Sequence, residues 1–112
     1  EFVRLAKTKG AITIFGGGQM RPFLEINSAV RAFCRGVKSN ITGQVINIVD
    51  ANITIRELGK MVGDMFGCVV KTIPEIIDRR SYQVDNAKAI SVFGFKPKPL
   101  KEGIEAMKVL KV

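Results

Sequence analysis

Apolar positions recur along this 112-residue chain at two spacings, and each spacing predicts one kind of element. Apolar residues three or four positions apart predict helices over residues 1–9, from 27 or 28 to about 37, 54–66, 86–93 and 99–110. β-Branched or nearly continuous apolar runs predict strands over residues 12–15, 22–26, 44–49 and 68–73. The resulting order is typical of an α/β or α+β fold in which short strands pack with four to five helices.

The second of these helices is expected to turn an apolar face to the core, and Asn27 or Ser28 is expected to cap it. The predicted face consists of Ala29, Val30, Phe33, Cys34 and Val37. Its basic residues lie mostly elsewhere and are expected to form a solvated face; they are Arg31, Arg35 and Lys38.

Two further stretches carry clear local signals. The run Gln44–Val49 is almost entirely apolar, which is typical of a strand covered on both faces in a parallel sheet, and residues 50–52 are expected to turn the chain. Thr54 and Glu57 form a capping box, in which each side chain bonds a free amide at the start of a helix. Gly67 is expected to end that helix.

Length and composition indicate one domain over residues 1–112, since 46% of the residues are hydrophobic. The longest apolar runs are much shorter than a membrane span, and no signal-peptide pattern opens the sequence. We therefore expect no membrane contact and a cytoplasmic location. Cys34 and Cys68 lack the CxxC spacing and there is no histidine, so a zinc site and Ser-His-Asp or Cys-His catalysis are excluded within this sequence. Both thiols are expected to be buried.

The formal net charge is +8, which favours anionic partners. The basic residues are spread along the chain, and one tyrosine and no tryptophan are present to stack on bases. A dedicated nucleic-acid module usually concentrates its charge on one stripe, so the distribution argues against nucleic acid as the partner.

The glycine run Gly16–Gly18 joins the first two predicted strands, and Arg21 follows it. Glycine lets a ligand approach the main chain, and an arginine guanidinium matches the oxygens of a phosphate. A simple hairpin with a surface arginine remains the alternative. A second arginine pair, Arg79 and Arg80, stands next to Tyr82. Two converging arginines would suit a diphosphate, and Phe15 and Tyr82 would offer flat faces to a base or sugar; taken singly, each is equally a surface cation or a packed ring.

Catalytic and cofactor motifs are not evident in these residues. Tyr82 and Lys88 are six positions apart rather than four, so they do not share a helical face as a tyrosine–lysine pair would. The glycine run is not GxGxxG and no helix follows it directly, so we assign no catalytic, cofactor-binding or metal-binding residue.

Six groups of residues, in this order, resemble the carboxyl-terminal part of the extended short-chain dehydrogenases, the NAD-dependent nucleotide-sugar epimerases and dehydratases. They are residues 12–24, residues 32–33, residues 43–48, residues 54–58, residues 78–82 with 84–85 and 88–89, and residues 93–97 with 100–104. The resemblance implies a small lobe that holds the nucleotide diphosphate of the sugar, attached to a Rossmann-type sheet. It implies that the segment around Phe15 and Gly16 lies along the base and that Arg21 and Arg80 approach the diphosphate; with Tyr82 these are the expected substrate-binding residues.

This sequence departs from the family in two ways. The dinucleotide fingerprint and the catalytic Tyr-x-x-x-Lys of the amino-terminal half are absent, so NAD belongs to the full-length family and no cofactor is expected in this chain. Residues 25–28 read Glu-Ile-Asn-Ser where the family commonly reads His-Val-Asp-Asp. The resemblance thus implies a nucleotide-sugar-binding lobe that is not catalytic alone and binds its ligand weakly.

The strand predicted at residues 44–49 would lack neighbouring strands in its sheet, and this indicates which partners to expect. An unpaired strand edge invites association, so we expect a homo-oligomer or pairing with a separate amino-terminal half. The alternative function is a free-standing basic interaction module that binds a protein or nucleic acid.

Overall fold

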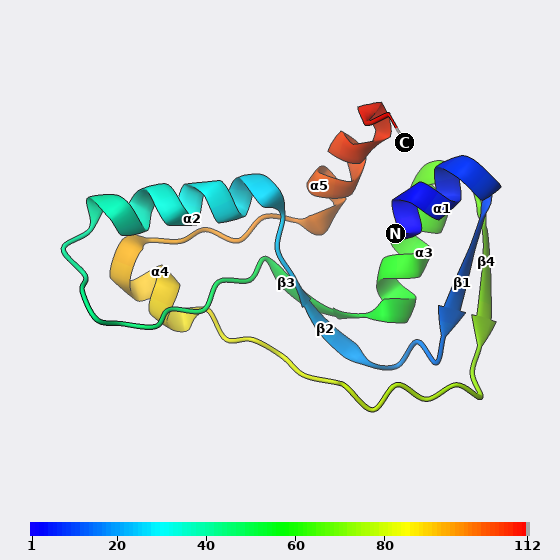
Figure 1. The fold of residues 1–112 in the computed structure, drawn as a ribbon, viewed down its shortest axis with the longest axis horizontal. Coiled ribbons are helices and arrows are strands. Elements are labelled where there is room, and N and C mark those ends of the chain that lie inside the picture. The colour runs from blue at the N-terminus through cyan, green and yellow to red at the C-terminus, as the bar shows by residue number, and fades with distance from the viewer. Residues whose placement is uncertain (112) are drawn as a thin grey trace.

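A computed structural model describes residues 1–111 of the chain, within which helices and short strands alternate (Figure 1). The helices are α1 (Phe2–Lys9), α2 (Ile26–Lys38), α3 (Ile55–Phe66), α4 (Ala87–Phe93) and α5 (Leu100–Ala106), followed by a 3-10 turn, η1 (Met107–Val109). The strands are β1 (Ala11–Phe15), β2 (Met20–Phe23), β3 (Ala51–Thr54) and β4 (Val69–Ile73). The mixed α/β character predicted from the sequence is confirmed.

The strands form two separate pairs. β1 and β4 run parallel, with Ala11 opposite Val69 and Phe15 opposite Ile73. β2 and β3 run antiparallel, with Met20 opposite Thr54. The glycine turn connects β1 to β2, so it joins one strand pair to the other.

The first apolar cluster holds α1 and α3 against the parallel pair. Ile12, Ile14 and Val62 are fully buried at its centre. Two glycines of α3 allow the close approach: a Cβ at Gly59 would lie 2.3 Å from the Cδ1 of Ile14, and one at Gly63 would lie 2.4 Å from a Val70 methyl. Small residues one turn apart therefore set the distance between the helix and the strands.

The second apolar cluster lies at the other end of the molecule. It consists of the buried Ala32 of α2, Ala89 of α4 and Phe95, with Ile46 and Ile48 packed against them. The Asp50 carboxylate ties the surrounding chain together, because it accepts hydrogen bonds from the backbone N–H of Glu25 at 2.7 Å and of Lys98 at 2.8 Å.

Helix ends follow the predicted chemistry in most places. The Thr54–Glu57 capping box is formed on both sides, and Gly67 ends α3 in the left-handed conformation. The predicted cap of α2 was wrong: Glu25 is the N-cap and its side chain accepts from the Ser28 N–H at 3.1 Å. A glutamate is long enough to reach back to that amide, and so the helix begins at Ile26.

The strand predicted at Gln44–Val49 was wrong. Ile46 and Ile48 pack against the second cluster and Val49 is buried, but Val45 is 85% exposed, so the segment is not covered on both faces along its length. Within residues 1–111 no strand pairs with it. The pairing occurs further on, in β3, which includes residues 51 and 52 of the stretch 50–52 that was expected to form a turn.

The prediction for the apolar face of α2 was also wrong. The helix buries Ser28 and Ala32 against its own chain, and it leaves Val30, Phe33 and Val37 exposed. Cys34 is exposed as well, against the expectation of a buried thiol, whereas Cys68 is partly buried. The larger apolar side chains of α2 thus point away from the chain that carries them.

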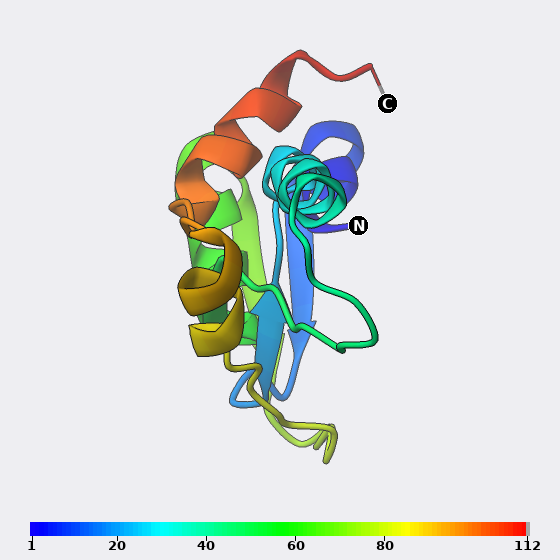
Figure 2. The ribbon, with the colours of Figure 1, turned by 90° about the vertical axis from the view of Figure 1, so that its left-hand side faces the viewer.

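The molecule is flat and extended, 47 × 33 × 17 Å along its principal axes. Figure 2 shows α2 end-on at one side, with α4 and α5 along the other. The radius of gyration is 16.1 Å, against about 13 Å for a compact domain of this length. In residues 1–111 no helix is both long and apolar enough to cross a bilayer.

Candidate anion-binding groove

The turn after β1 depends on glycine. Gly16 has a φ of 69° and donates its N–H to the carbonyl of Ile73 at 2.9 Å. A Cβ at this position would lie 2.6 Å from the carbonyl oxygen of Ile76, which is backbone and cannot move aside easily. The turn can therefore pack closely against the segment that follows β4 only if residue 16 is glycine.

Gln19 fixes the shape of the same turn. Its side-chain oxygen accepts from the Gly17 N–H at 2.7 Å, and its side-chain nitrogen donates to the Phe15 carbonyl at 3.0 Å. The turn therefore has its own internal bonds, and β2 leaves it in a defined direction.

Arg21 of β2 is the best-defined cation of the region. Its Nη2 donates to the Asp78 carboxylate at 2.9 Å, and the side chain is only 17% exposed. The guanidinium carbon lies 5.5 Å from the centre of the Tyr82 ring, within cation–π range. Its Nη1 is buried and has no hydrogen-bond partner in residues 1–111. A buried guanidinium nitrogen without an acceptor is costly, so it marks Arg21 as a side chain whose hydrogen bonds are incomplete within these residues.

Asp78 joins the two predicted arginine sites. Its carboxylate accepts from the backbone N–H and from two guanidinium nitrogens of Arg80, each at 3.0 Å, in addition to Arg21. These hydrogen bonds, with Arg80 the main cause, lower the pKa of Asp78 to about 2. The carboxylate is thus ionised at neutral pH and holds both arginines.

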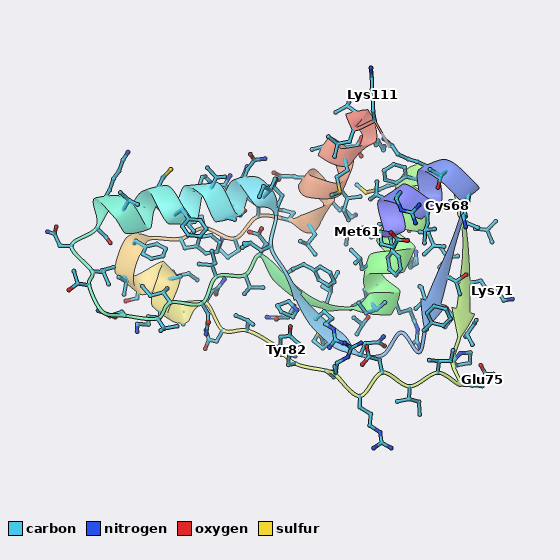
Figure 3. All side chains as sticks on the ribbon, viewed as in Figure 1. Met61, Cys68, Lys71, Glu75, Tyr82 and Lys111 are labelled. Atoms are coloured by element: carbon cyan, nitrogen blue, oxygen red, sulfur yellow. The ribbon has the colours of Figure 1, made fainter. Side chains whose placement is uncertain are left out.

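The segment containing these residues runs alongside β2 and β3. The Met20 N–H donates to the hydroxyl of Ser81 at 2.9 Å, and the Tyr82 N–H donates to the Met20 carbonyl at 3.2 Å. Further on, the Asn52 side chain makes two hydrogen bonds of 2.9 Å to the backbone of Val84. Figure 3 shows Tyr82 on this segment, beside β2. Residues distant in sequence are therefore held next to the glycine turn.

Together these elements border an open groove of about 790 Å³. Phe2, Thr13, Phe15, Gln19, Arg21, Ile55, Ile76, Ile77, Asp78 and Arg80 line it. Of the residues singled out from the sequence, Phe15, Arg21 and Arg80 are in this lining. Gly16 borders an adjoining hollow with Asp78 and Arg79, and Tyr82 lies outside the lining but against Arg21.

The sequence interpretation missed the part that Asp78 plays. An aspartate two positions before an arginine in a loop is typical of an Asx turn, in which the carboxylate accepts the backbone N–H two residues on. That signal was present in the run Asp78–Arg80. The apolar wall of the groove, from Ile55, Ile76 and Ile77, carried no local signal, because it forms only when α3 and the segment after β4 meet.

Another hollow, of about 490 Å³, lies between α3 and β4. Its charged lining consists of Arg56, Lys60 and Asp64, and Lys60 and Asp64 pair with each other at 2.9 Å. The groove is the stronger candidate because two arginines from distant parts of the sequence meet there beside aromatic side chains.

The glycine turn does not fit a dinucleotide site. A dinucleotide motif leads from a strand into the N-terminus of a helix, which receives the pyrophosphate. Here Gly16–Gly18 lead from β1 into β2. We therefore derive no step through NAD from these residues.

No family model and no curated protein matches the sequence. Solved structures do match. UDP-glucuronic acid 4-epimerase from Bacillus cereus in complex with NAD is 25% identical, with a TM-score of 0.74 over 94% of this chain and 36% of its own. MoeE5 in complex with UDP-glucuronic acid and NAD is 27% identical, with a TM-score of 0.72 over 92% of this chain and 37% of its own. ADP-L-glycero-D-manno-heptose-6-epimerase from Helicobacter pylori is 19% identical, with a TM-score of 0.79 over 97% and 36%.

Nearly all of the chain is covered in each case, and the chain spans little more than a third of each similar protein. The similarity predicted from the sequence motifs is confirmed. The fold of this chain is that of a part of the NAD-dependent nucleotide-sugar epimerases and dehydratases, consistent with the carboxyl-terminal part of an extended short-chain dehydrogenase.

Proposed function

We propose that this chain is a nucleotide-sugar-binding lobe that holds the diphosphate of its ligand in the groove between the glycine turn and the segment after β4. In this proposal Arg21 and Arg80 contact the diphosphate, while Phe15, Gly16 and Tyr82 border the base or the sugar. The lobe binds without catalysing a reaction, and the NAD-dependent chemistry belongs to a part outside these 112 residues. A cytoplasmic location, where nucleotide sugars are handled, belongs to the same proposal.

The observation that carries the proposal is the convergence of Arg21 and Arg80 on one carboxylate at the wall of the groove. The two arginines come from distant parts of the sequence, so their meeting is a property of the fold. The Arg21 Nη1 still lacks an acceptor, and Arg80 is 83% exposed, which leaves its guanidinium accessible to a ligand. Arginine forks bind phosphate oxygens in pairs, so two arginines at one groove suit the two phosphates of a diphosphate.

Similar solved structures support the choice of ligand class. Two of them, the B. cereus epimerase with NAD and MoeE5 with UDP-glucuronic acid and NAD, are 25% and 27% identical to this chain. Because the chain spans only 36% and 37% of their lengths, the affinity of the isolated lobe is expected to be weak.

Isothermal titration of the 112-residue chain with UDP, dTDP, GDP, CDP and ADP, and then with the sugars of the best base, tests the proposal. Uridine without phosphate serves as the ligand control. We expect one nucleoside diphosphate to bind and the nucleoside alone to show no heat.

Arg80→Ala and Arg79→Ala form a matched pair of variants for this titration. Both remove one guanidinium from adjacent positions, but only Arg80 is in the lining of the groove. Arg80→Ala is expected to weaken binding at least tenfold while Arg79→Ala has little effect. Equal losses in the two variants, or no binding of any nucleotide at millimolar concentration, would refute the proposal.

The exposed apolar face of α2 favours a second candidate function, a basic interaction module that binds a protein. Nucleic acid is the other partner of that candidate, and it would appear as binding to generic DNA that falls steeply with salt. Such binding in the absence of a nucleotide response would favour the module over the lobe.

A further inference from the structure

The segment that leaves β4 is held to the rest of the chain by few bonds. We call residues 74–80 the strap; in Figure 1 they belong to the extended trace that follows β4. Within residues 1–111, no backbone–backbone hydrogen bond involves residues 74–81, and the flanking bonds join Gly16 to Ile73 and Tyr82 to Met20. Every strap residue except Asp78 is exposed. Segments with few buried contacts and few backbone hydrogen bonds open at a low free energy.

Asp78 anchors the strap. Its carboxylate accepts from the Arg21 Nη2 at 2.9 Å, and the two side chains are only 24% and 17% exposed. The other hydrogen bonds of this carboxylate come from Arg80, which belongs to the strap itself. In the part of the chain that the structure describes, the bond to Arg21 is therefore the one hydrogen bond from the strap to another element.

The remaining contacts of the strap would be lost at little cost. Its backbone packs on the glycine turn, where a Cβ at Gly16 would lie 2.6 Å from the Ile76 carbonyl oxygen. The side chains of Ile76 and Ile77 are already 49% and 79% exposed. Little apolar area would thus be newly exposed to water if the strap moved, so the hydrophobic effect does not hold it in place.

The anchored residue stands between two hollows. Gln19, Ile77 and Asp78 line both the groove of about 790 Å³ and the adjoining hollow of about 370 Å³. Two of these three residues belong to the strap. A strap that leaves Arg21 would carry Ile77 and Asp78 away from this shared wall, and the two spaces would join.

An anion in the groove would compete with Asp78 for Arg21. Phosphate oxygens and a carboxylate use the same charge-assisted donors, and a phosphate that engages two guanidinium nitrogens replaces the single bond to Asp78. The Arg21 Nη1 has no partner within residues 1–111, so a second donor is present. Two anions side by side also repel each other, which favours departure of the carboxylate over its sharing the site.

We propose that Asp78 is a latch: its bond to Arg21 holds the strap in place, and a diphosphate that takes Arg21 releases the strap and joins the groove to the adjoining hollow. The release step rests on the proposed function, because it needs an anion in the groove. The latch itself is a property of the ligand-free chain and can be tested separately.

Limited digestion with trypsin tests the latch without a ligand. Cleavage after Arg79 or Arg80, identified by mass, reports how often the strap opens. Arg21→Ala breaks the anchor and leaves the sequence of the strap unchanged, so strap cleavage is expected to be about tenfold faster, the scale of one charge-assisted hydrogen bond. Arg35→Ala is the matched control, because Arg35 also holds a distant segment, the C-terminal end of α4, and its loss is expected to leave strap cleavage unchanged. Circular dichroism checks that both variants are folded.

A tryptophan on the strap tests the release, and it does not depend on the folding of Arg21→Ala. The natural sequence has no tryptophan and Ile77 is 79% exposed, so Ile77→Trp gives a single reporter. Pyrophosphate is the probe, because it has no base that could stack on the new ring, and sodium chloride at equal ionic strength is the control. Pyrophosphate is expected to shift the emission. Asp78→Asn in the same background is expected to begin closer to the shifted emission and to respond less.

Equal strap cleavage in Arg21→Ala and Arg35→Ala, or an emission shift no larger than that with sodium chloride, would overturn the latch. Calorimetry with nucleoside diphosphates separates this result from failure of the proposed function. A nucleotide that binds while the emission stays unchanged leaves the nucleotide-binding lobe standing and removes the latch alone. If neither pyrophosphate nor any nucleotide binds, both proposals fail.

Discussion

The Nη2 atom of Arg21 lies 2.9 Å from an Asp78 carboxylate oxygen, although the two residues are 57 positions apart in the sequence. This bond connects β2 to the segment after β4 at the wall of the groove. The same carboxylate also holds Arg80. Asp78 is therefore already paired with Arg21 and Arg80, the two cations that we expect to bind a diphosphate.

Replacing Asp78 by asparagine is expected to increase diphosphate affinity. The amide removes one negative charge beside Arg21 and Arg80, and the gain is expected to be about three- to fivefold, the scale of one exposed ion pair. Titration of the tightest-binding nucleoside diphosphate measures it. Asp64→Asn is the control, because it removes the same charge from the pair with Lys60 on α3. A loss of affinity as large as that in Arg80→Ala would instead mean that Asp78 positions the arginines.

The stability of the chain is expected to fall in acid partly through Asp78. The pKa of this carboxyl is about 2 in the folded chain, against an ordinary value of 3.8. A lowered pKa means that the stabilising contribution is present above pH 3.8 and is lost as the pH falls toward 2. Urea unfolding at pH 5 and pH 2.5 is expected to show a smaller loss for Asp78→Asn than for the natural sequence. Identical losses would contradict this assignment.

The contact between Gly59 and Ile14 predicts a coupled pair of substitutions. Gly59→Ala adds a methyl group where only 2.3 Å is free, and overpacking of this kind costs about 1–3 kcal/mol. Ile14→Val removes the Cδ1 atom that the new methyl would meet, at a cost of about 0.5–1.5 kcal/mol. The double variant is expected to lose less stability in urea than the sum of the two single losses. Additive losses would show that α3 moves away instead.

The capping box at the start of α3 predicts a selective loss of stability. Thr54→Ala removes the hydroxyl that accepts the Glu57 N–H at 3.1 Å, and loss of such a cap costs about 0.5–2 kcal/mol. Thr54→Ser keeps the hydroxyl and is expected to stay within about 0.5 kcal/mol of the natural sequence. Thermal unfolding of the two variants measures the difference, and equal losses would point to the methyl group rather than the cap.

Signals that act over a few residues predicted much of this fold. The capping box located α3, β-branched runs located β1 and β4, and the glycine run located the turn that leads to Arg21. Each of these signals depends only on residues close together along the chain, so the sequence alone is enough to recognise it.

Features that depend on a distant partner could not be predicted in the same way. The run Gln44–Val49 has the composition of a strand, but a strand also needs a neighbour to bond with, and residues 1–111 place none beside it. The spacing of Val30, Phe33 and Val37 shows that one face of α2 is apolar but not which surface it meets. Asp78 was recognisable as part of a charged loop, while its bond to Arg21 required the fold.

The division of the core into two apolar clusters gives the chain two units that can open separately. Phe2 and Ile55 belong to the first cluster and line the groove, whereas α2 contributes Ala32 to the second. In amide hydrogen exchange, a nucleotide is therefore expected to slow exchange in β1 and α3 and to leave exchange in α2 and α4 unchanged. Ligand binding would then protect one part of a short chain while the other part still opens.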